Sequence, residues 1–200
     1  MNVLIVVEDE PSEAVLRRLV AATGHKLSVS TVFRANGFGN IRNRIQNFRN
    51  ASHVTPHIVM TDLDTYTCPP ELLKDWGVGM LPSRMLMRIA VREVESWLLA
   101  DRAGIANLIK VPVTKIPALP DELPDPKQVL LNLARHSRSR RFASEFVPAN
   151  GSKAKHGPAY NQHLSRFASQ DWDSSQAALA SPSLQRSIRR IKEFAQHLHA

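Results

Sequence analysis

The chain contains a single cysteine, Cys68, among its 200 residues. One cysteine cannot build a disulfide framework or a cysteine-based structural zinc site, so we expect a reducing, cytoplasmic setting. The sequence also lacks any run of about 18 uncharged apolar residues. Its first residues, MNVLIVVEDE, lack the basic segment that begins a secretory signal. We therefore expect neither a membrane-spanning helix nor a secretory leader.

The sequence patterns of several functional classes are absent as well. No Gly-x-x-x-x-Gly-Lys loop is present, so the chain does not resemble a P-loop ATPase, and any dependence on ATP would come from a partner. The chain has eight histidines, but His197 and His199, in the expected terminal helix, are two residues apart and face different ways. We therefore predict no zinc site.

The positive charge that is present is distributed unevenly. Residues 1–126 hold 14 Lys and Arg against 14 Asp and Glu, whereas residues 127–200 hold 12 against 4. This distribution fits two interpretations: a surface that binds the phosphates of nucleic acid, and a solvated helical surface that aids solubility. Under the first interpretation the candidate phosphate-binding side chains are Arg138, Arg140, Arg141, Lys153 and Lys155.

Hydrophobic patterning over the first 100 residues predicts alternating strands and helices. The expected strands cover residues 3–7, 27–33, 57–61 and 85–91. The expected helices have Pro11 in the first turn, run through Ile41 and Phe48, and cover residues 93–100. This short alternation implies right-handed crossovers and an α/β fold, in which an open, Rossmann-like parallel sheet has helices on both faces.

The rest of the chain changes in character after residue 110. Residues 111–126 contain five prolines and are expected to form an extended connector. Helices are expected beyond it, near residues 127–135, 159–169 and 183–199. We predict three parts: an α/β core over residues 1–110, the proline-rich connector over 111–126, and a basic helical extension over 127–200 that packs on the core.

Acidic residues follow the expected strands at the points where these strands end. Glu8 follows the first strand, Asp62 and Asp64 follow the third, and Glu93 and Glu95 follow the fourth. Because the carboxyl ends of parallel strands meet at one edge, these side chains are expected to gather there. Gathered carboxylates repel one another unless a cation neutralises them, and oxygen ligands suit Mg²⁺ or Mn²⁺. We predict a divalent-metal site; the alternative is that the acids cap helices and end solvated loops.

The remaining candidates each have two interpretations. Glu93 fits both a helix start and a metal ligand, and because Glu93 and Glu95 cannot share one helix face, at most one of them is expected to point into the site. Lys155 lies in a predicted loop and is either a cation for a scissile phosphate or an exposed lysine. Arg92 is either a second such cation or a salt-bridge partner within the acidic edge.

Longer motifs accompany these acids. They are Glu8 with Glu13, Gly37-Phe38-Gly39, Asp62-Leu63-Asp64, the run REVESWLLAD at residues 92–101, Asp125-Pro126-Lys127, and Lys155-His156-Gly157-Pro158. On these motifs the chain resembles the TOPRIM domain of topoisomerases, primases and OLD-type nucleases. It is similar to a bacterial TOPRIM-like family of short proteins that are often paired with ABC-type or SMC-like ATPases.

The resemblance implies a divalent-metal-dependent phosphodiester hydrolase, a TOPRIM-type nuclease, or a nucleic-acid-processing subunit. It implies DNA or RNA as the substrate and a partner ATPase in anti-phage defence, and it leaves homo-oligomerisation open. Asp62 and Asp64 would hold Mg²⁺ or Mn²⁺, with Glu93 as a further candidate ligand. Glu8 would bind a second metal ion or move a proton, and Lys155 or Arg92 would neutralise developing charge.

Two other hypotheses remain. The acidic pair after the first strand, Asp62 after the third, and Lys110 before Pro112 resemble a response-regulator receiver domain, which implies that Asp62 accepts a phosphoryl group. The receiver pattern also requires a Thr or Ser at the end of the fourth strand, where this chain has Ala90-Val91-Arg92-Glu93. The third hypothesis is a non-catalytic interaction or regulatory subunit that has the same fold without the chemistry.

Overall fold

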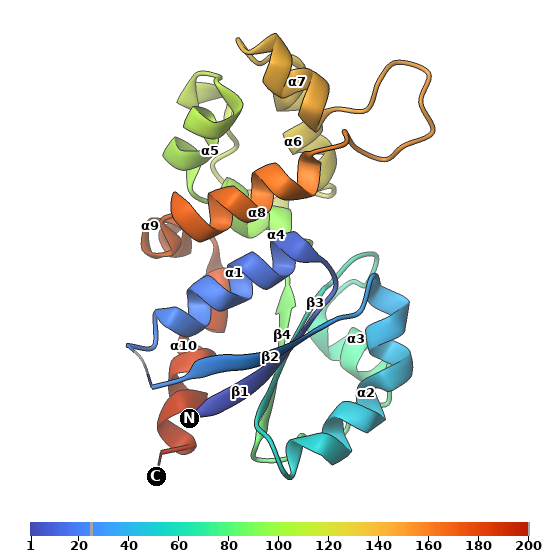
Figure 1. Cartoon of the computed structure of the whole chain (residues 1–200), viewed down its shortest axis with the longest axis vertical. Helices are drawn as coiled ribbons and strands as arrows, with labels where there is room; N and C mark the ends of the chain where they lie inside the picture. Colours follow the sequence, from blue (N-terminus) through green and yellow to red (C-terminus); the bar gives the residue numbers. More distant parts are fainter. Residues whose placement is uncertain (25, 200) are drawn as a thin grey trace.

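The protein is described by a computed structural model that covers residues 1–24 and 26–199. Its centre is a four-stranded sheet in the order β2-β1-β3-β4, in which each neighbouring pair is parallel (Figure 1). The strands are β1 (Asn2–Val7), β2 (Ser28–Arg34), β3 (His57–Asp62) and β4 (Met85–Ala90). The expected α/β fold with a parallel sheet is confirmed, and each expected strand end lies no more than one residue from the observed one.

Helices connect the strands and make up the rest of the chain. Up to residue 109 they are α1 (Glu10–Ala21), α2 (Phe38–Ser52), α3 (Pro69–Asp75), α4 (Val94–Leu99) and α5 (Arg102–Ile109). Two 3-10 turns follow, η1 (Val113–Lys115) and η2 (Pro120–Glu122), and they interrupt the segment that was expected to be extended. The last helices are α6 (Pro126–Arg135), α7 (Arg140–Phe146), α8 (Tyr160–Gln170), α9 (Ser174–Ala180) and α10 (Pro182–His197).

The start of α1 shows how local sequence shapes the carboxyl edge of the sheet. Asp9 caps the helix, since its Oδ1 accepts a hydrogen bond from Ser12 N (3.0 Å). Pro11 stands in the first turn, where a missing N–H leaves no bond unmade. Val15 and Leu16 then face the core. This cap turns the chain sharply after β1 and leaves Glu8 at the strand end.

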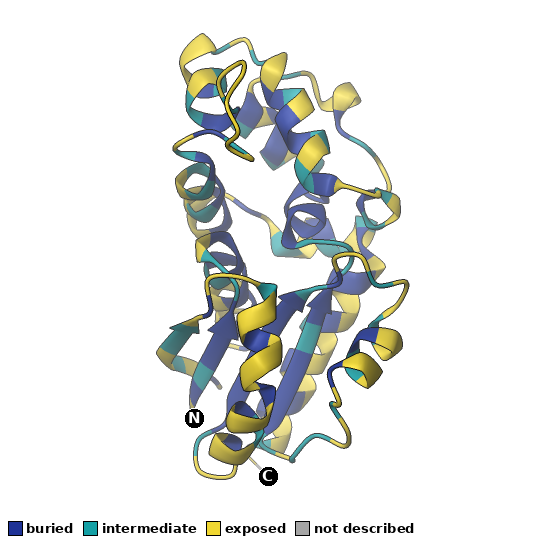
Figure 2. Cartoon of the chain, turned by 90° about the vertical axis from the view of Figure 1, so that its right-hand side faces the viewer, coloured by how far each residue is buried: buried dark blue, intermediate teal, exposed yellow. Residues whose placement is uncertain are grey.

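The two faces of the sheet are covered by different helices (Figure 2). On one face, Val3, Ile5 and Val7 of β1 belong to a hydrophobic cluster that includes α1, α4, α8 and α10. On the other face, Val6 and Val59 pack with α2 and α3. Crossovers of one hand that run in opposite directions from β1 put α1 and α2 on opposite faces. The expected helices on both faces are thereby confirmed.

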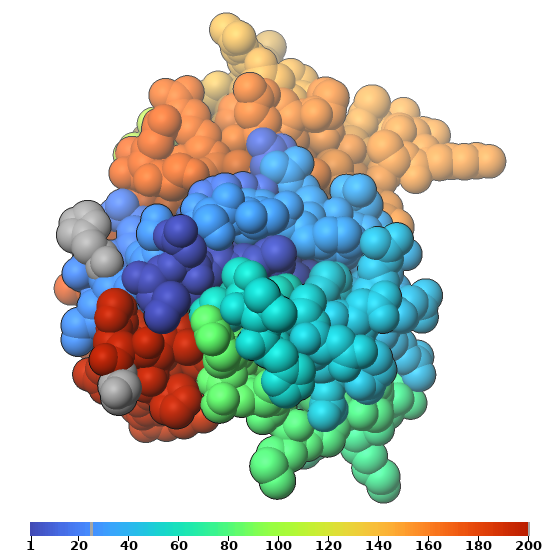
Figure 3. All heavy atoms as spheres, turned by 60° about the horizontal axis from the view of Figure 1, so that its bottom comes forward, coloured from blue at the N-terminus to red at the C-terminus, as the bar shows by residue number. Residues whose placement is uncertain are grey.

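The C-terminal helices pack directly on the first half of the chain. α8 lies against α1, and α10 lies against β4. Tyr160 and Phe167 of α8 and Ile191 of α10 are buried in the same cluster as Val3 of β1. In Figure 3 the C-terminal helix lies beside the start of the chain. The segment between α7 and α8 projects from the body (Figure 1).

The strand order also determines where a ligand would bind. The chain passes from β1 outward to β2 and then returns to β3 on the other side of β1. In open α/β sheets the crevice at such a reversal, outside the carboxyl ends of the strands, is the usual binding position. Glu8 and Asp62 stand at this crevice, after β1 and at the end of β3. Within the described ranges, no helix is both long and apolar enough to cross a lipid bilayer.

Candidate functional site

The acidic residues at the carboxyl edge centre on a contact between Glu8 and Asp62. Glu8 Oε1 accepts hydrogen bonds from Thr61 Oγ1 (2.6 Å) and from Asp62 N (2.9 Å). The strands that carry these residues, β1 and β3, are parallel neighbours, so strand pairing brings the two carboxylates to one point of the edge. Two of the four predicted metal ligands therefore lie together.

The surroundings of these two carboxylates disfavour adjacent negative charges. Asp62 Oδ1 accepts a hydrogen bond from Val94 N (2.9 Å) at the start of α4. Burial raises the pKa of Glu8, although the hydrogen bonds from Thr61 and Asp62 oppose the shift. Burial, and then the charges of Glu8 and Glu95, raises the pKa of Asp62 well above its usual range. A bound cation would relieve this repulsion.

Asp64, the third predicted ligand, lies on an exposed loop after β3. Its backbone is left-handed (φ 51°), and its N–H donates to the carbonyl oxygen of Arg92 (3.1 Å). Arg92 in turn donates from Nη1 to the carbonyl oxygens of Asp64 (3.1 Å) and Tyr66 (2.9 Å). Arg92 therefore holds the loop that carries Asp64. After burial, the charge of Asp64 is among the causes that raise the pKa of Glu8, so the two carboxylates lie within electrostatic reach.

Glu93 and Glu95 converge on Lys127 of α6. Glu93 Oε2 accepts the backbone N–H of Lys127 (3.1 Å), while Glu95 Oε1 lies 3.3 Å from Lys127 Nζ. Tyr160 Oη also donates to Glu95 Oε1 (2.9 Å). Both glutamates therefore face Lys127, and among the residues that the structure describes neither forms a hydrogen bond with Glu8 or Asp62, so the prediction that at most one of them points into the metal site stays a prediction. Glu93 precedes α4 with an extended backbone (φ −137°, ψ 163°), so helical periodicity does not set the direction of its side chain.

The surroundings of Glu93 and Lys127 shift the pKa values of both side chains. Burial and the charge of Glu95 raise the pKa of Glu93 to about 7. The charges of Glu95 and Glu93 raise the pKa of Lys127, although burial opposes the shift. The side chain of Glu95 is only 4% exposed, against 32% for Lys127. Lys127 therefore neutralises one buried carboxylate of this edge, and the edge as a whole keeps an excess of negative charge.

The fit of a divalent cation follows from the oxygen atoms that remain free. No group of three His, Cys, Asp or Glu side chains in residues 1–24 and 26–199 is placed to hold a metal ion. Among the same residues, no hydrogen bond reaches Glu8 Oε2 or Asp62 Oδ2, and neither atom is fully buried. Mg²⁺ retains several waters and is commonly bound through one or two carboxylates together with substrate phosphates. Glu8 and Asp62 fit this mode of binding.

The basic residues predicted to bind nucleic acid are all exposed: Arg138, Arg140, Arg141, Lys153 and Lys155. Arg141 is paired with Glu145 (Nε to Oε1, 2.9 Å). Lys153 and Lys155 belong to the projecting segment between α7 and α8. His156, next to Lys155, stacks its ring on Tyr160 with centroids 4.7 Å apart. Because Tyr160 binds Glu95, this stacking anchors the end of the projecting segment beside the acidic edge.

Sequence reasoning assigned no role to Lys127, Thr61 or Tyr160. The Asp125-Pro126-Lys127 motif carried a usable signal for Lys127, because Asp125 caps α6 through a bond from Gln128 N (2.7 Å). That cap fixes the direction of the first turn of α6, where Lys127 contacts Glu93 and Glu95. Tyr160 had no such signal, since the residue it binds is 65 positions away in the chain.

The lysine of the receiver-like pattern lies elsewhere. Lys110 ends α5 in a left-handed conformation (φ 62°), and its Nζ donates to Asn107 Oδ1 (3.2 Å). Lys110 forms none of the hydrogen bonds to Glu8 or Asp62 that are described above.

Comparison of the chain with protein-family models, with curated proteins and with solved structures found no match.

Proposed function

We propose that the protein is a divalent-metal-dependent phosphodiester hydrolase that acts on nucleic acid. The observation that carries the proposal is the pair formed by Glu8 and Asp62 at the strand-order reversal. Both carboxylates have raised pKa values, and each keeps one oxygen without a hydrogen bond among the described residues. One oxygen of each carboxylate has a structural partner, but the mutual repulsion of the two groups opposes folding unless a cation neutralises it. A cation that accompanies a phosphate removes that penalty.

In this proposal Glu8 and Asp62 hold Mg²⁺ or Mn²⁺, and Asp64 joins them from its exposed loop. The metal ion, when bound, polarises the phosphate and stabilises the charge that develops on it. Glu93, whose pKa lies at about 7, is suited to hold or release a proton near neutral pH. Arg92 positions the Asp64 loop through its two carbonyl contacts, and Lys155 remains the candidate cation for the phosphate.

The proposed partners follow from the motif resemblance and from the charge distribution. The TOPRIM-like motifs favour an ABC-type or SMC-like ATPase that presents DNA or RNA to the acidic edge, in a setting such as anti-phage defence. Exposed basic side chains before α8 favour contact with phosphates, namely Arg138, Arg140, Arg141, Lys153 and Lys155.

Amide substitutions test the acidic pair without removing its hydrogen-bond acceptors. Asp62→Asn can still accept from Val94 N, and Glu8→Gln can still accept from Thr61 and Asp62, so both variants are expected to fold. Asp62→Asn should lose Mn²⁺ binding in calorimetric titration. Glu8→Gln should lower the rate of single-turnover cleavage by about 10²–10⁴-fold if Glu8 moves the proton. The matched control is Glu10→Gln, an exposed acid in the first turn of α1 that should leave both measurements unchanged.

The assay uses labelled duplex and single-stranded DNA and RNA with Mg²⁺ or Mn²⁺, with and without a purified ATPase partner. Metal-dependent products that disappear in Asp62→Asn support the proposal. Undiminished Mn²⁺ binding in Asp62→Asn contradicts the metal site. The absence of any metal-dependent product under every condition would favour the non-catalytic subunit instead.

A further inference from the structure

A second region of the surface, separate from the acidic edge, is hollowed and basic. Three cavities of about 570, 620 and 410 Å³ adjoin one another between α5, α7 and α8, because they share lining residues. Lys110 lines all three. We call this continuous depression the basic groove; its charged and titratable lining residues are Lys110, Arg138, Arg141, Glu145, His163, Arg166 and Asp171.

The charges of the basic groove do not cancel. Arg141 and His163 both contact Glu145, at 2.9 Å each, so these three side chains form a local unit. Lys110, Arg138 and Arg166 form no ion pair among the residues that the structure describes, and all three are exposed. Asp171, which lines one of the three cavities, is the remaining acid. An anion in the groove would therefore meet three cations without a carboxylate partner.

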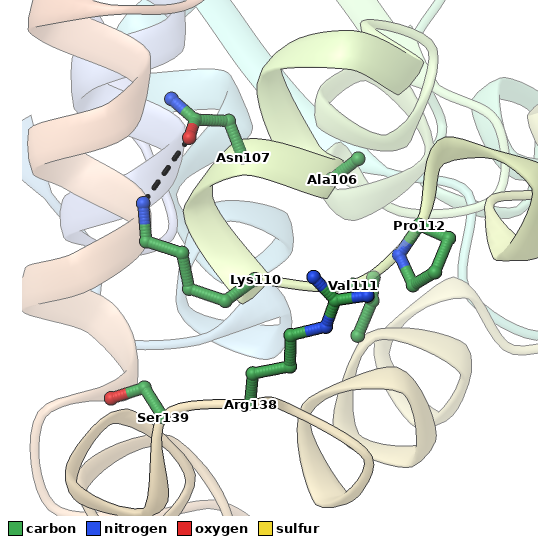
Figure 4. Close-up of a pocket in the computed structure, with 7 residues that line it drawn as sticks. All are labelled: Ala106, Asn107, Lys110, Val111, Pro112, Arg138 and Ser139. Carbon is green, nitrogen blue, oxygen red and sulfur yellow. Dashed lines mark hydrogen bonds between the residues drawn. The ribbon is translucent and has the colours of Figure 1, made fainter.

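The backbone holds two of these cations in a fixed relation. Arg138 N donates to the carbonyl oxygen of Lys110 (3.2 Å), which ties the loop before α7 to the end of α5. In Figure 4 the side chains of Lys110 and Arg138 enter the space from these two elements. Lys110 has a left-handed backbone (φ 62°), a conformation that favours glycine. Lys110 is the C-cap of α5, so a glycine could take its place without backbone strain.

The lining of the groove also restricts the kind of ligand. Its aromatic residues are Phe142, 9% exposed, and Phe167, 1% exposed, so neither offers a free ring face for a base. Proteins that hold single strands rely on such stacking, whereas contacts to a duplex backbone need only cations and hydrogen-bond donors. Ser139 and Asn107 supply polar groups beside Lys110 and Arg138.

We propose that the basic groove binds the phosphate backbone of duplex nucleic acid through Lys110, Arg138 and Arg166. This inference rests on the proposed function for the nature of the substrate and adds the surface that holds it. The proposal adds Lys110 and Arg166 to the phosphate-binding candidates that the charge distribution of the sequence indicated. It also predicts binding that does not depend on the metal ion.

The test measures the affinity of a fluorescent 20-base-pair duplex by anisotropy, in a buffer that contains a chelator. The triple variant K110A/R138A/R166A should bind more weakly, and the slope of log affinity against log salt should fall by about 0.9 for each phosphate that the protein no longer neutralises. The matched control, R186A/R189A/K192A, removes the same charge from exposed positions of α10 and should bind as the wild type does. Equal weakening in the two variants, or an unchanged slope in the groove variant, overturns the proposal.

The variant Lys110→Gly distinguishes a loss of duplex binding from a loss of folding stability. Glycine suits the left-handed backbone at this position, so the thermal midpoint should stay the same or rise while duplex affinity falls. A single strand of equal length that binds more tightly than the duplex would overturn the assignment to a duplex. Groove-dependent duplex binding without any metal-dependent cleavage would leave the groove standing and refute the hydrolase.

Discussion

Lys127 is expected to be the most sensitive single position of the acidic edge. Lys127→Met removes the ammonium group that lies 3.3 Å from Glu95 Oε1 but keeps the backbone N–H that holds Glu93. The Glu95 side chain is 4% exposed, and removing the partner of a buried ion costs about 3–5 kcal/mol. Tyr160 still donates to Glu95, and Lys127 is 32% exposed, so we expect a smaller loss of about 2–3 kcal/mol.

A double-mutant cycle isolates this contact. The free energy of unfolding is measured in urea at pH 8 for the wild type, Lys127→Met, Glu95→Gln and the double variant. Because Glu95→Gln removes the charge that Lys127 compensates, the double variant should lose less than the sum of the single variants, with a coupling energy above about 1 kcal/mol. Lys153→Met, in the projecting segment, is the control and should change stability by less than about 0.5 kcal/mol. Additive single effects would refute the pairing.

Two further predictions concern protonation and packing. Since burial raises the pKa of Glu93 to about 7, this carboxyl stabilises the folded state below about pH 4.5 and loses that contribution as the pH rises through 7. Glu93→Gln should flatten the stability profile over this window by about 1–2 kcal/mol after allowance for solvent screening, in chelator-containing buffer; an unaltered profile would contradict the shift. A Cβ at Gly157 would lie 2.4 Å from the carbonyl oxygen of Glu145, so Gly157→Ala should lower stability by about 2–3 kcal/mol in thermal unfolding. Gly39→Ala, with nothing within 4 Å, serves as its control and should be neutral or stabilising.

Much of the sheet could be predicted because its strands have strong local signals. Continuous β-branched runs at β1 and β3 are typical of strands buried on both faces. Short helices were harder: α3, α5, α7 and α9 have at most eight residues each, too few to show a clear apolar period. Their ends depend on caps such as Asp101, whose side chain accepts from Gly104 N (2.9 Å), and Asp173.

The residues of the candidate site also differ in how far the sequence predicts their position. Glu8 and Asp62 could be predicted to meet, because parallel strands put their carboxyl ends at one edge whatever the rest of the chain does. Tyr160 could not, because it reaches the edge through the packing of α8, which no local pattern encodes. For Lys127 the local sequence indicates the cap of α6 but not the acids that this helix start meets. The roles of these residues in metal binding and hydrolysis remain predictions until the variants above are measured.

The burial of Val3, Tyr160 and Ile191 in one hydrophobic cluster has a consequence for the synthesis of the protein. A ribosome completes β1, α1 and the rest of the sheet long before it has made α8 and α10. During that interval the outer side of α1 and the β4 face of the sheet lack the helices that cover them. The nascent chain therefore carries exposed apolar surface until its last helix emerges, and such intermediates are prone to aggregate. The core on this side of the sheet is therefore complete only once α10 has been made, and a chaperone that shields α1 until then should raise the yield of folded protein.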